Sequence, residues 1–454
     1  MTRHVPALVV GGGISGLVCA YALRKAGIDA QVVEASPRPG GVIHSVTRDG
    51  FLLELGPQSF SGTPALRELC AELGISNELL QAPPHAPRYV LIGGALRPVP
   101  LSPPAFFMSS LINGSTKWAL LRDILGKSIP PDGDESVATF VRRKFSPQLL
   151  DRLVGPFVSG IYAGDPERLS VRSAFPQLYE AEKSAGSIVR GMLRLAKAKK
   201  GPRERPTLLA FREGNETLVR ALANKLGPAL FTETAATEIS RQQDGSFAIR
   251  LQSHGRDDSV SARSLILATP TDVTGRLLSR LDSSFDSLLS PIEYGAVAVV
   301  SLGYRQKDVG HSLDGFGFLV PRSAGLRVLG SVWNSSLFPG RAPEGQALLT
   351  SFVGGTTDSA AATLEPQELV SLVHREISPV LSVKSAPIFS NVTIWPRALP
   401  QYNLGHGDRL ARIDQLRAQF PGIWLAGNYL RGPAIGSCLD QALAVAEHVR
   451  ERRS

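Results

Sequence analysis

Apolar runs and helical repeats of apolar residues mark both ends of the 454-residue chain. Residues 7–10, ALVV, carry no polar side chain, which predicts a strand buried on both faces. Residues 30–33 predict a second strand. The segment between them predicts a helix whose apolar side carries Leu17, Ala20, Tyr21 and Leu23. The order of strand, helix and strand predicts a parallel α/β unit.

The C-terminal end of the chain repeats this order. Residues 423–426 predict a strand, and a helix from about residue 434 to 450 follows, with a stripe formed by Ala442, Val445 and Ala446. Related segments in the middle of the chain are a loop and helix at 207–227, a strand edge at 236–239 and a strand at 264–270. We therefore predict one domain that is assembled from three separate pieces of chain.

Glycines separate the first predicted strand from its helix. Gly11, Gly13 and Gly16 have the spacing G-x-G-x-x-G, and Glu34 ends the second strand. In a dinucleotide fold the first glycine permits the turn, the second lets a diphosphate touch the backbone, and the third lets the helix approach the strand. The helix N-terminus then faces the phosphates, and the acid accepts the ribose hydroxyls. The alternative is a glycine turn that binds nothing.

The residues after Glu34 indicate which dinucleotide is bound. Arg38 with Gly40 and Gly41 makes an E-x3-R-x-G-G pattern. This pattern resembles the extended fingerprint of FAD enzymes of the amine-oxidase and desaturase type, in which the arginine and the glycine amides meet the diphosphate. For Arg38 alone, the alternative is a surface salt bridge. The resemblance implies non-covalent FAD.

The resemblance also implies a role for the C-terminal helix, whose N-terminus would point at the N1–C2=O side of the reduced flavin. Cys438 in its first turn has either a lowered pKa or a core position. Motif and resemblance together predict cofactor contacts from Gly11, Gly13, Ile14, Ser15, Gly16, Glu34, Ala35, Arg38, Gly40, Gly41, Val42, Gly56, Pro57, Gln58, Ser59, Ala236, Trp395, Gly427, Pro433, Ala434 and Ile435.

Composition limits the class of protein. The chain is 43% hydrophobic, so it can bury a large core. Its three cysteines lie far apart, which argues against a disulfide framework and for a reducing compartment. The N-terminus lacks the pattern of a signal peptide, and no run reaches the ~18 apolar residues of a spanning helix. The net charge of +9 favours acidic partners, but no nucleic-acid recognition motif accompanies it.

Four further segments distinguish this chain from other flavoenzymes: residues 87–107, 155–165, 315–341 and 395–406. With these segments, the whole length resembles the protoporphyrinogen and coproporphyrinogen oxidases. Residues 155–165, GPFVSGIYAGD, contain too much glycine for an expected helix. The resemblance implies that their backbone lines a pocket for a bulky macrocycle. The alternative is an ordinary turn between helices.

The resemblance implies that Arg88 pairs with a substrate propionate, a task that suits a bidentate guanidinium. Leu319, Val332 and Phe352 are expected to contact the macrocycle, but they could equally be core residues. Trp395, with Pro396 and Tyr402, is expected to form a wall beside the flavin. The predicted substrate residues are Arg88, Phe157, Gly160, Gly164, Leu319, Val332 and Phe352.

The sequence identifies no catalytic side chain, since it shows no Ser-His-Asp set, no metal-spaced His/Cys cluster and no paired carboxylates. That pattern is typical of a reaction carried by a flavin, whose N5 accepts a hydride before oxygen reoxidises it. His44 and His406 are the candidates for a base, although a lone histidine is more often structural. The resemblance implies six-electron oxidation of protoporphyrinogen. The alternatives are coproporphyrinogen oxidation, another flavin oxidase or desaturase, and a non-catalytic flavoprotein.

We therefore predict a mixed α/β and α+β fold. A discontinuous Rossmann-like FAD domain spans residues 1–75, 207–273 and 410–454, a helical region spans 76–206, and a mixed-sheet substrate domain spans 274–409. Segments 99–112 and 190–205 would form an apolar patch with a basic rim for a membrane surface, or else a buried helix and a solvated loop. We expect a cytoplasmic protein that is either free or bound peripherally to the inner face of the cell membrane. A homodimer and transfer of product to a ferrochelatase stay open.

Overall fold

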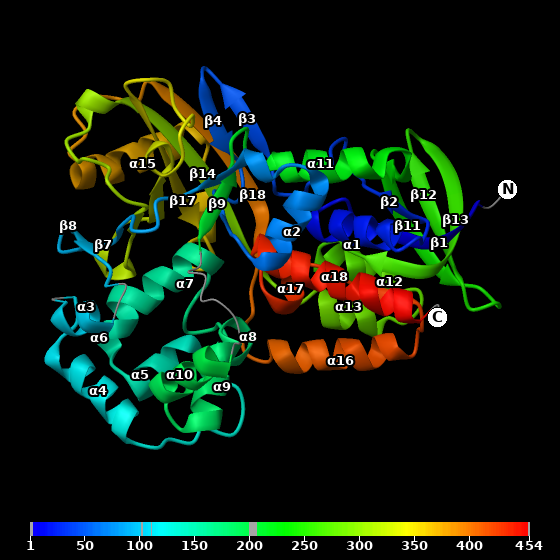
Figure 1. Ribbon diagram of the computed structural model, residues 1–454, viewed down its shortest axis with the longest axis horizontal. Helices are drawn as coiled ribbons and strands as arrows, with labels where there is room; N and C mark the ends of the chain where they lie inside the picture. Colours follow the sequence, from blue (N-terminus) through cyan, green and yellow to red (C-terminus); the bar gives the residue numbers. More distant parts are fainter. Residues whose placement is uncertain (1–2, 101–102, 110, 199–206, 453–454) are drawn as a thin grey trace.

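The computed structural model describes residues 3–100, 103–109, 111–198 and 207–452. Within them, two seven-stranded sheets and a lobe of helices make up most of the molecule (Figure 1). The N- and C-termini both lie at the end formed by the first sheet, far from the helical lobe. No described helix is long and apolar enough to cross a bilayer.

The first sheet, called here the cofactor sheet, combines strands from distant parts of the chain. Its strands are, in order, β10 (Leu230–Phe231), β2 (Ala30–Val33), β1 (Arg3–Val10), β13 (Arg256–Leu267), β12 (Phe247–Ser253) and β11 (Thr234–Arg241), with β19 (Ile423–Leu425) also beside β13. β10, β2, β1, β13 and β19 pair in parallel, whereas β12 and β11 are antiparallel. The predicted strands all form, and 236–239 lies in the edge strand. The boundaries given for the domains stay a prediction.

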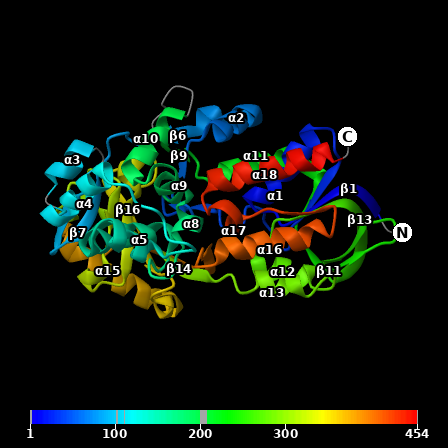
Figure 2. The same ribbon diagram turned by 90° about the horizontal axis from the view of Figure 1, so that it is seen from below.

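Helices cover both faces of the cofactor sheet. Side chains on opposite faces of β1 therefore belong to two different hydrophobic cores. One core contains α1 (Ile14–Lys25), α2 (Pro64–Leu73), α11 (Glu216–Leu226) and α18 (Ile435–Glu451). The other contains α12 (Thr271–Leu278), α13 (Ser284–Leu289), α16 (His406–Ala418) and the short α17 (Asn428–Arg431). Figure 2 shows α11 and α18 on one side, and α12, α13 and α16 on the other.

The second sheet, the substrate sheet, is mixed, as the sequence predicted. Its order is β18 (Phe389–Pro400), β14 (Tyr294–Arg305), β17 (Gln346–Gly354), β16 (Val328–Trp333), β15 (Gly317–Leu319), β7 (Arg88–Ile92) and β8 (Ala95–Pro98). Only the β15–β7 pairing is parallel. Helix α15 (Pro366–Leu381) covers one face, and α7 (Gly155–Tyr162) packs against the other at β15 and β16.

Two small sheets connect these parts. One is the hairpin of β3 (Ser45–Arg48) and β4 (Phe51–Glu54), and the other combines β5 (Phe60–Ser61), β9 (Leu208–Phe211) and β6 (Leu79–Gln81). The prediction of a loop at the start of 207–227 was therefore wrong, because β9 pairs with strands far away in the sequence.

The helical lobe comprises α3 (Pro103–Met108), α4 (Gly114–Leu125), α5 (Val137–Lys144), α6 (Pro147–Leu149), the π-helix η2 (Leu150–Val154), α7, α8 (Val171–Ala174), α9 (Pro176–Ala185) and α10 (Ile188–Ala198). The expectation that 155–165 is not helical was wrong. Helix α7 continues directly from η2, so its glycines do not have to nucleate it. It ends at Ala163, which has a left-handed φ of 47°.

The predicted membrane patch is also corrected in part. Leu111 and Ile112 are buried, so the end of the 99–112 segment is core. The Arg190 guanidinium donates to the carbonyls of Ile124, Gly126 and Ala185, and therefore closes the end of α4 instead of forming a basic rim. Residues 199–205 of the predicted rim lie outside the described residues.

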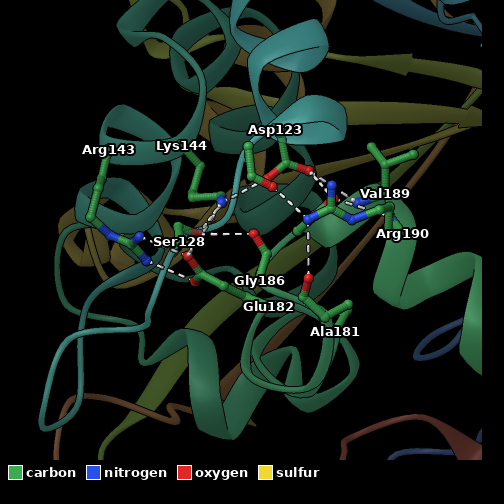
Figure 3. A network of polar contacts seen from close by, with 12 residues as sticks. Asp123, Ser128, Arg143, Lys144, Ala181, Glu182, Gly186, Val189 and Arg190 are labelled. Carbon is green, nitrogen blue, oxygen red and sulfur yellow. Dashed lines mark hydrogen bonds and ion pairs between the residues drawn. The ribbon is translucent and has the colours of Figure 1, made fainter.

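A buried charge network connects four helices of the lobe (Figure 3). On α5, Arg143 donates to Glu182 at 2.8 and 2.9 Å, and Lys144 lies 3.3 Å from the same carboxylate. Lys144 also lies 2.6 Å from Asp123 of α4. Asp123 in turn accepts hydrogen bonds from Ser187 and from the backbone N–H of residue 189 at the start of α10. Because α9 carries Glu182, the network fixes α4, α5, α9 and α10 together.

We expect Glu182→Gln to lower the free energy of unfolding by about 3 kcal/mol, since removal of one partner leaves buried charge uncompensated. Glu167→Gln is the control, because the Arg142–Glu167 pair is exposed and contributes at most about 1 kcal/mol. Urea titrations measure both. Equal effects of the two substitutions would contradict a structural role of the network.

The same carboxylate predicts a pH dependence. Burial opposes its charge, but hydrogen bonds from Arg143 and Ser128 and the charge of Lys144 outweigh burial and lower the pKa of Glu182 to about 2, from an ordinary 4.5. A depressed pKa stabilises the fold above the unfolded value. The wild type should therefore lose this stability as pH falls from 4.5 towards 2, and Glu182→Gln should lack that component of the titration.

Candidate functional site

The glycine turn after β1 is built on close backbone contacts. Gly11 has φ +107°, and a Cβ there would lie 2.6 Å from the carbonyl oxygen of Ala268. A Cβ on Gly16 would lie 1.9 Å from the carbonyl oxygen of Gly11. Both glycines are therefore required by the fold itself, because α1 starts directly against the turn.

Gly13 differs from its neighbours because a Cβ there would meet nothing within 4 Å. It is the N-cap of α1 and offers no side-chain cap, so the first N–H groups of the helix, at Ile14 and Ser15, have no capping side chain. The backbone of Gly40 donates to Gly12, and Gly41 lies over Gly13. This open, glycine-walled helix start fits the diphosphate of a dinucleotide.

Glu34 lies at the end of β2, on the same side as the glycine turn. Its carboxylate accepts from the N–H of Gly12 at 2.6 Å and from the N–H of Ser36 at 2.8 Å. Ala35 follows it, and Ala236 lies on β11 next to a bulge. The carboxyl ends of parallel strands are where such sheets bind nucleotides. The contacts predicted for these residues stay a prediction.

Arg38 holds the loop that carries the glycine pair. Its guanidinium donates to the carbonyls of Pro39 at 3.1 Å, Gly41 at 2.6 Å and Ile43 at 3.1 Å. It lies 3.8 Å from the carboxylate of Glu216 at the start of α11. The structure thus gives Arg38 a bracing role, and its contact with a diphosphate stays a prediction. Val42, in this loop, is exposed.

The loop formed by Gly56, Pro57, Gln58 and Ser59 joins the two small sheets, between β4 and β5. A Cβ on Gly56 would lie 2.0 Å from the carbonyl oxygen of Val42, so the two loops touch through bare backbone. The Gln58 amide is buried, donates to the carbonyls of Glu54 and Gly56 at 2.8 Å, and accepts from Asn334 of the substrate domain at 2.7 Å. Its side chain is therefore structural, and contact of this loop with a flavin stays a prediction.

Sequence reasoning missed Glu54 and Arg341, a buried pair beneath this loop. Their charged groups are 3.4 Å apart and each side chain is 1% exposed. Glu54 also accepts from Ser45 Oγ at 2.6 Å and from the N–H of Asn215 at 2.9 Å. Burial raises the pKa of Glu54 to about 7 despite these partners. The sequence signal that could have indicated a buried Glu54 is its position as a lone acid inside an apolar run, in the segment LELGP.

The C-terminal helix begins as predicted. Ala434 is the N-cap of α18 and offers no side-chain cap, and the preceding Gly427 adopts a φ of +157°. Pro433 and Ile435 flank the cap. Cys438 is buried, and burial raises the pKa of its thiol to about 11, so the alternative of a core residue is correct.

Of the two histidine candidates for a base, His406 is held in a structural position, whereas the role of His44 stays a prediction. His406 is 4% exposed, its Nε2 lies 2.9 Å from the carbonyl oxygen of Tyr429, and its ring stacks on Tyr402 at 4.5 Å. Burial lowers its pKa to about 4. For His44, burial and then the charge of Arg38 lower the pKa. Tyr402 is itself buried in the helical lobe, so its prediction as a flavin wall was wrong.

One face of the substrate sheet gathers the predicted apolar substrate residues. Leu319 is opposite Gly330 in the ladder, and Gly330 is opposite Phe352, so their side chains share a face. Val332 lies two residues after Gly330 and points the same way. All three side chains are half-buried, whereas the opposite face is sealed by α15.

The same face continues to both edges of the sheet. Val90 of β7 is opposite Leu319, which puts Arg88 on this face as well, and the Arg88 guanidinium lies 5.5 Å from the ring of Phe316. At the other edge Trp395 donates through Nε1 to the carbonyl of Leu55 at 2.6 Å. The indole is therefore fixed to the chain just before the 56–59 loop.

Helix α7 lies over this face. Phe157 and Ile161 are 43% and 44% exposed on one side of it, and a Cβ on Gly160 would lie 2.5 Å from Leu319. Gly160 thus sets how closely helix and sheet approach. Gly164 is buried, and a Cβ there would lie 2.7 Å from the amide oxygen of Gln401, so the expectation that its backbone lines the pocket was wrong.

The family model for flavin containing amine oxidoreductases matches residues 14–450. A chloroplastic protoporphyrinogen oxidase of Oryza sativa subsp. japonica is 36% identical over 98% of this chain and 88% of its own length. The chain belongs to the porphyrinogen oxidases within the flavin-containing amine oxidoreductase family. It is an FAD-dependent oxidoreductase of that family.

The relatives of this chain include oxidases named for either of the two porphyrinogen substrates. Coproporphyrinogen III oxidase of Bacillus subtilis (strain 168) is 28% identical over 97% of each chain. A crystal structure from Exiguobacterium sp. 255-15, provisionally named a protoporphyrinogen oxidase, superposes with a TM-score of 0.81 at 26% identity, over 100% of this chain and 99% of the other. A putrescine oxidase at 20% identity and a TM-score of 0.74, covering all of both chains, shares the fold alone.

We expect Gly13→Ala to fold normally but to bind FAD at least about tenfold more weakly. The added methyl group meets no protein atom, but it would occupy the space into which the diphosphate must come. Thermal melting of the apoprotein and quenching of flavin fluorescence on titration measure the two effects. Gly114→Ala is the control, since it also lies in open space at a helix start. Normal FAD affinity of Gly13→Ala would contradict binding of the diphosphate at this helix start.

Proposed function

We propose that this protein oxidises protoporphyrinogen IX to protoporphyrin IX, with FAD as cofactor and oxygen as acceptor. Coproporphyrinogen III is the second candidate substrate. The observation that carries the proposal is the sheet face between Arg88 and Trp395, which combines an apolar surface for a macrocycle with a guanidinium for a carboxylate. Chloroplastic protoporphyrinogen oxidases at 34–36% identity support the first substrate. Coproporphyrinogen III oxidases at 28–29% fall in the same range as two other protoporphyrinogen oxidases at 27–29%, so the second candidate stays open.

The residues of this chain would bind and orient the reactants. FAD, when bound, supplies the hydride acceptor for each two-electron step. The helix starts at Gly13 and Ala434 would hold its diphosphate and ring. Leu319 and Phe352 would contact one side of the macrocycle, and Phe157 of α7 would contact the other. This enclosure excludes water and fixes the ring carbon that loses the hydride, while Arg88 fixes the carboxylate edge.

The test is oxidation of each porphyrinogen in air by the purified, FAD-loaded protein, followed by porphyrin fluorescence against a control without enzyme. We expect acceleration with both and a higher kcat/KM for protoporphyrinogen. Preference for coproporphyrinogen would support the second candidate. No acceleration with either, despite bound FAD, would overturn the proposal and favour a non-catalytic flavoprotein.

We also propose that the helical lobe docks on an anionic lipid surface. Exposed apolar side chains gather on it, and we call this set the apolar face: Met108, Trp118, Leu121, Leu125, Ile129, Met192, Leu193 and Leu195. Trp118, Leu121 and Leu125 follow helical spacing on α4, which packs beside α10. Both helices lie in the lobe remote from the cofactor sheet (Figures 1 and 2).

Charge favours lipid as the partner of the apolar face. The charged residues of α10 are all basic, and its exposed residues include Arg194 and Lys197. On α4 the single acid, Asp123, is buried in the charge network, so Lys117 and Arg122 determine the charge that it presents. An apolar surface bordered by cations matches anionic headgroups above an acyl layer. A homodimer and transfer of product to a ferrochelatase stay predictions.

We expect Trp118→Glu to weaken binding to phosphatidylserine-containing vesicles about tenfold, because it removes a large apolar contact and adds a repelled charge. Ile388→Glu is the control, since Ile388 is 43% exposed but lies on the substrate domain. Co-sedimentation at several salt concentrations measures binding. Equal binding of both variants and the wild type would contradict this docking surface.

A further inference from the structure

A second arginine lies beside Arg88 on the same face of the substrate sheet. β7 and β8 form a hairpin at the sheet edge, and Arg97 of β8 is directly opposite Val90 of β7. Residues opposite each other in an antiparallel pair share a face, and so do residues two apart on one strand. Arg88 and Arg97 are therefore diagonal neighbours, with Cα atoms about 7–8 Å apart.

The packing of the hairpin supports this orientation. Leu91 and Leu96, also opposite each other, belong to the core beneath α15 on the other face of the sheet. Val90 is 1% exposed on the face of Leu319, where the helical lobe packs on β7. Arg97 thus projects on the side of α7 and of the proposed ring site, and both arginines are exposed.

Neither arginine is in an ion pair with an acid of the described chain. Two other arginines of the substrate sheet are paired: Arg327, just before β16, lies 2.7 Å from Asp358, and Arg397, on the opposite edge strand β18, lies 2.9 Å from Asp272. Asp151, on the π-helix that packs on β7, accepts instead from Ser323 at 3.0 Å.

Within the described chain, Arg88 and Arg97 thus place unpaired charge at the β7–β8 edge of this face, whereas Arg397 at the β18 edge is paired with Asp272. Beyond the hairpin the face continues through Leu319, Phe352 and Val299 to Trp395, with no charged side chain among these residues. A guanidinium fork binds one carboxylate well. Two such forks at one edge suit a ligand with two carboxylates on one side, and an apolar floor disfavours a ligand with carboxylates on opposite sides.

We propose that Arg97 is a second carboxylate-binding residue, which with Arg88 holds the substrate by a single charged edge. The inference rests on the proposed function and narrows it: the substrate is a macrocyclic dicarboxylate with both carboxylates on one side, in preference to a tetracarboxylate. Arg97 positions the ring in its plane and acts on affinity, not on the chemical step.

The test compares binding of protoporphyrin IX, its dimethyl ester and coproporphyrin III to the FAD-loaded wild type and to Arg97→Gln, by porphyrin fluorescence. We expect Arg97→Gln to bind the diacid about tenfold more weakly and the ester unchanged, as loss of one charge-assisted contact predicts. In turnover, KM for protoporphyrinogen should rise with kcat unchanged. Arg305→Gln is the control, an exposed arginine at the end of β14.

Each other outcome overturns part of the inference. Unchanged diacid affinity in Arg97→Gln would exclude the contact, and a parallel loss for diacid and ester would make Arg97 merely structural. Coproporphyrin bound as tightly as protoporphyrin would contradict the single charged edge. If the wild type oxidises a porphyrinogen but Arg97→Gln behaves like Arg305→Gln, only this inference fails. If the wild type neither oxidises nor binds these macrocycles, the proposed function fails with it.

Discussion

The relation between the cofactor part and the substrate part depends on one buried carboxylate. Glu54 ends β4, accepts from the backbone at the start of α11, and faces Arg341 from the substrate domain. The backbone carbonyl of Glu54 accepts a hydrogen bond from the side-chain amide of Gln58, and the amide oxygen of Gln58 accepts one from Asn334. Three segments that are far apart in the sequence thus meet at one side chain. A buried charge is costly without partners, so the cluster forms only when all three segments are in place.

This arrangement explains why a flavin site can be assembled from separate pieces of chain. The glycine turn, the 56–59 loop and the start of α18 each offer backbone and few side chains, so each alone would bind a cofactor weakly. The cofactor sheet fixes the first and third through β1, β13 and β19. The Glu54 cluster fixes the second, and Trp395 ties the substrate sheet to the same loop. Preorganised backbone donors then need little rearrangement when an anion binds.

The sequence allowed the cofactor sheet to be predicted because its central strands are buried on both faces and appear as unbroken apolar runs. The glycine turn was readable for a similar local reason, since spacing alone encodes it. Other features depend on distant partners. β9 forms because β5 and β6 lie beside it, Tyr402 is buried because helices surround it, and Arg341 meets Glu54 across most of the chain. No local pattern contains that information.

Helix α7 shows how one irregular turn can set the geometry of a site. The N–H of Gly155 bonds to the carbonyl of Leu150, five residues back, so the turn closed by this bond in η2 contains one residue more than a turn of an α-helix, in which the bond spans four residues. Each residue advances a helix by about 100°. The π-turn therefore acts as a phase shift: it rotates the rest of the helix so that Gly160 meets the sheet and Phe157 stays open. Without that extra residue, the same sequence would present a different side of α7 to the sheet.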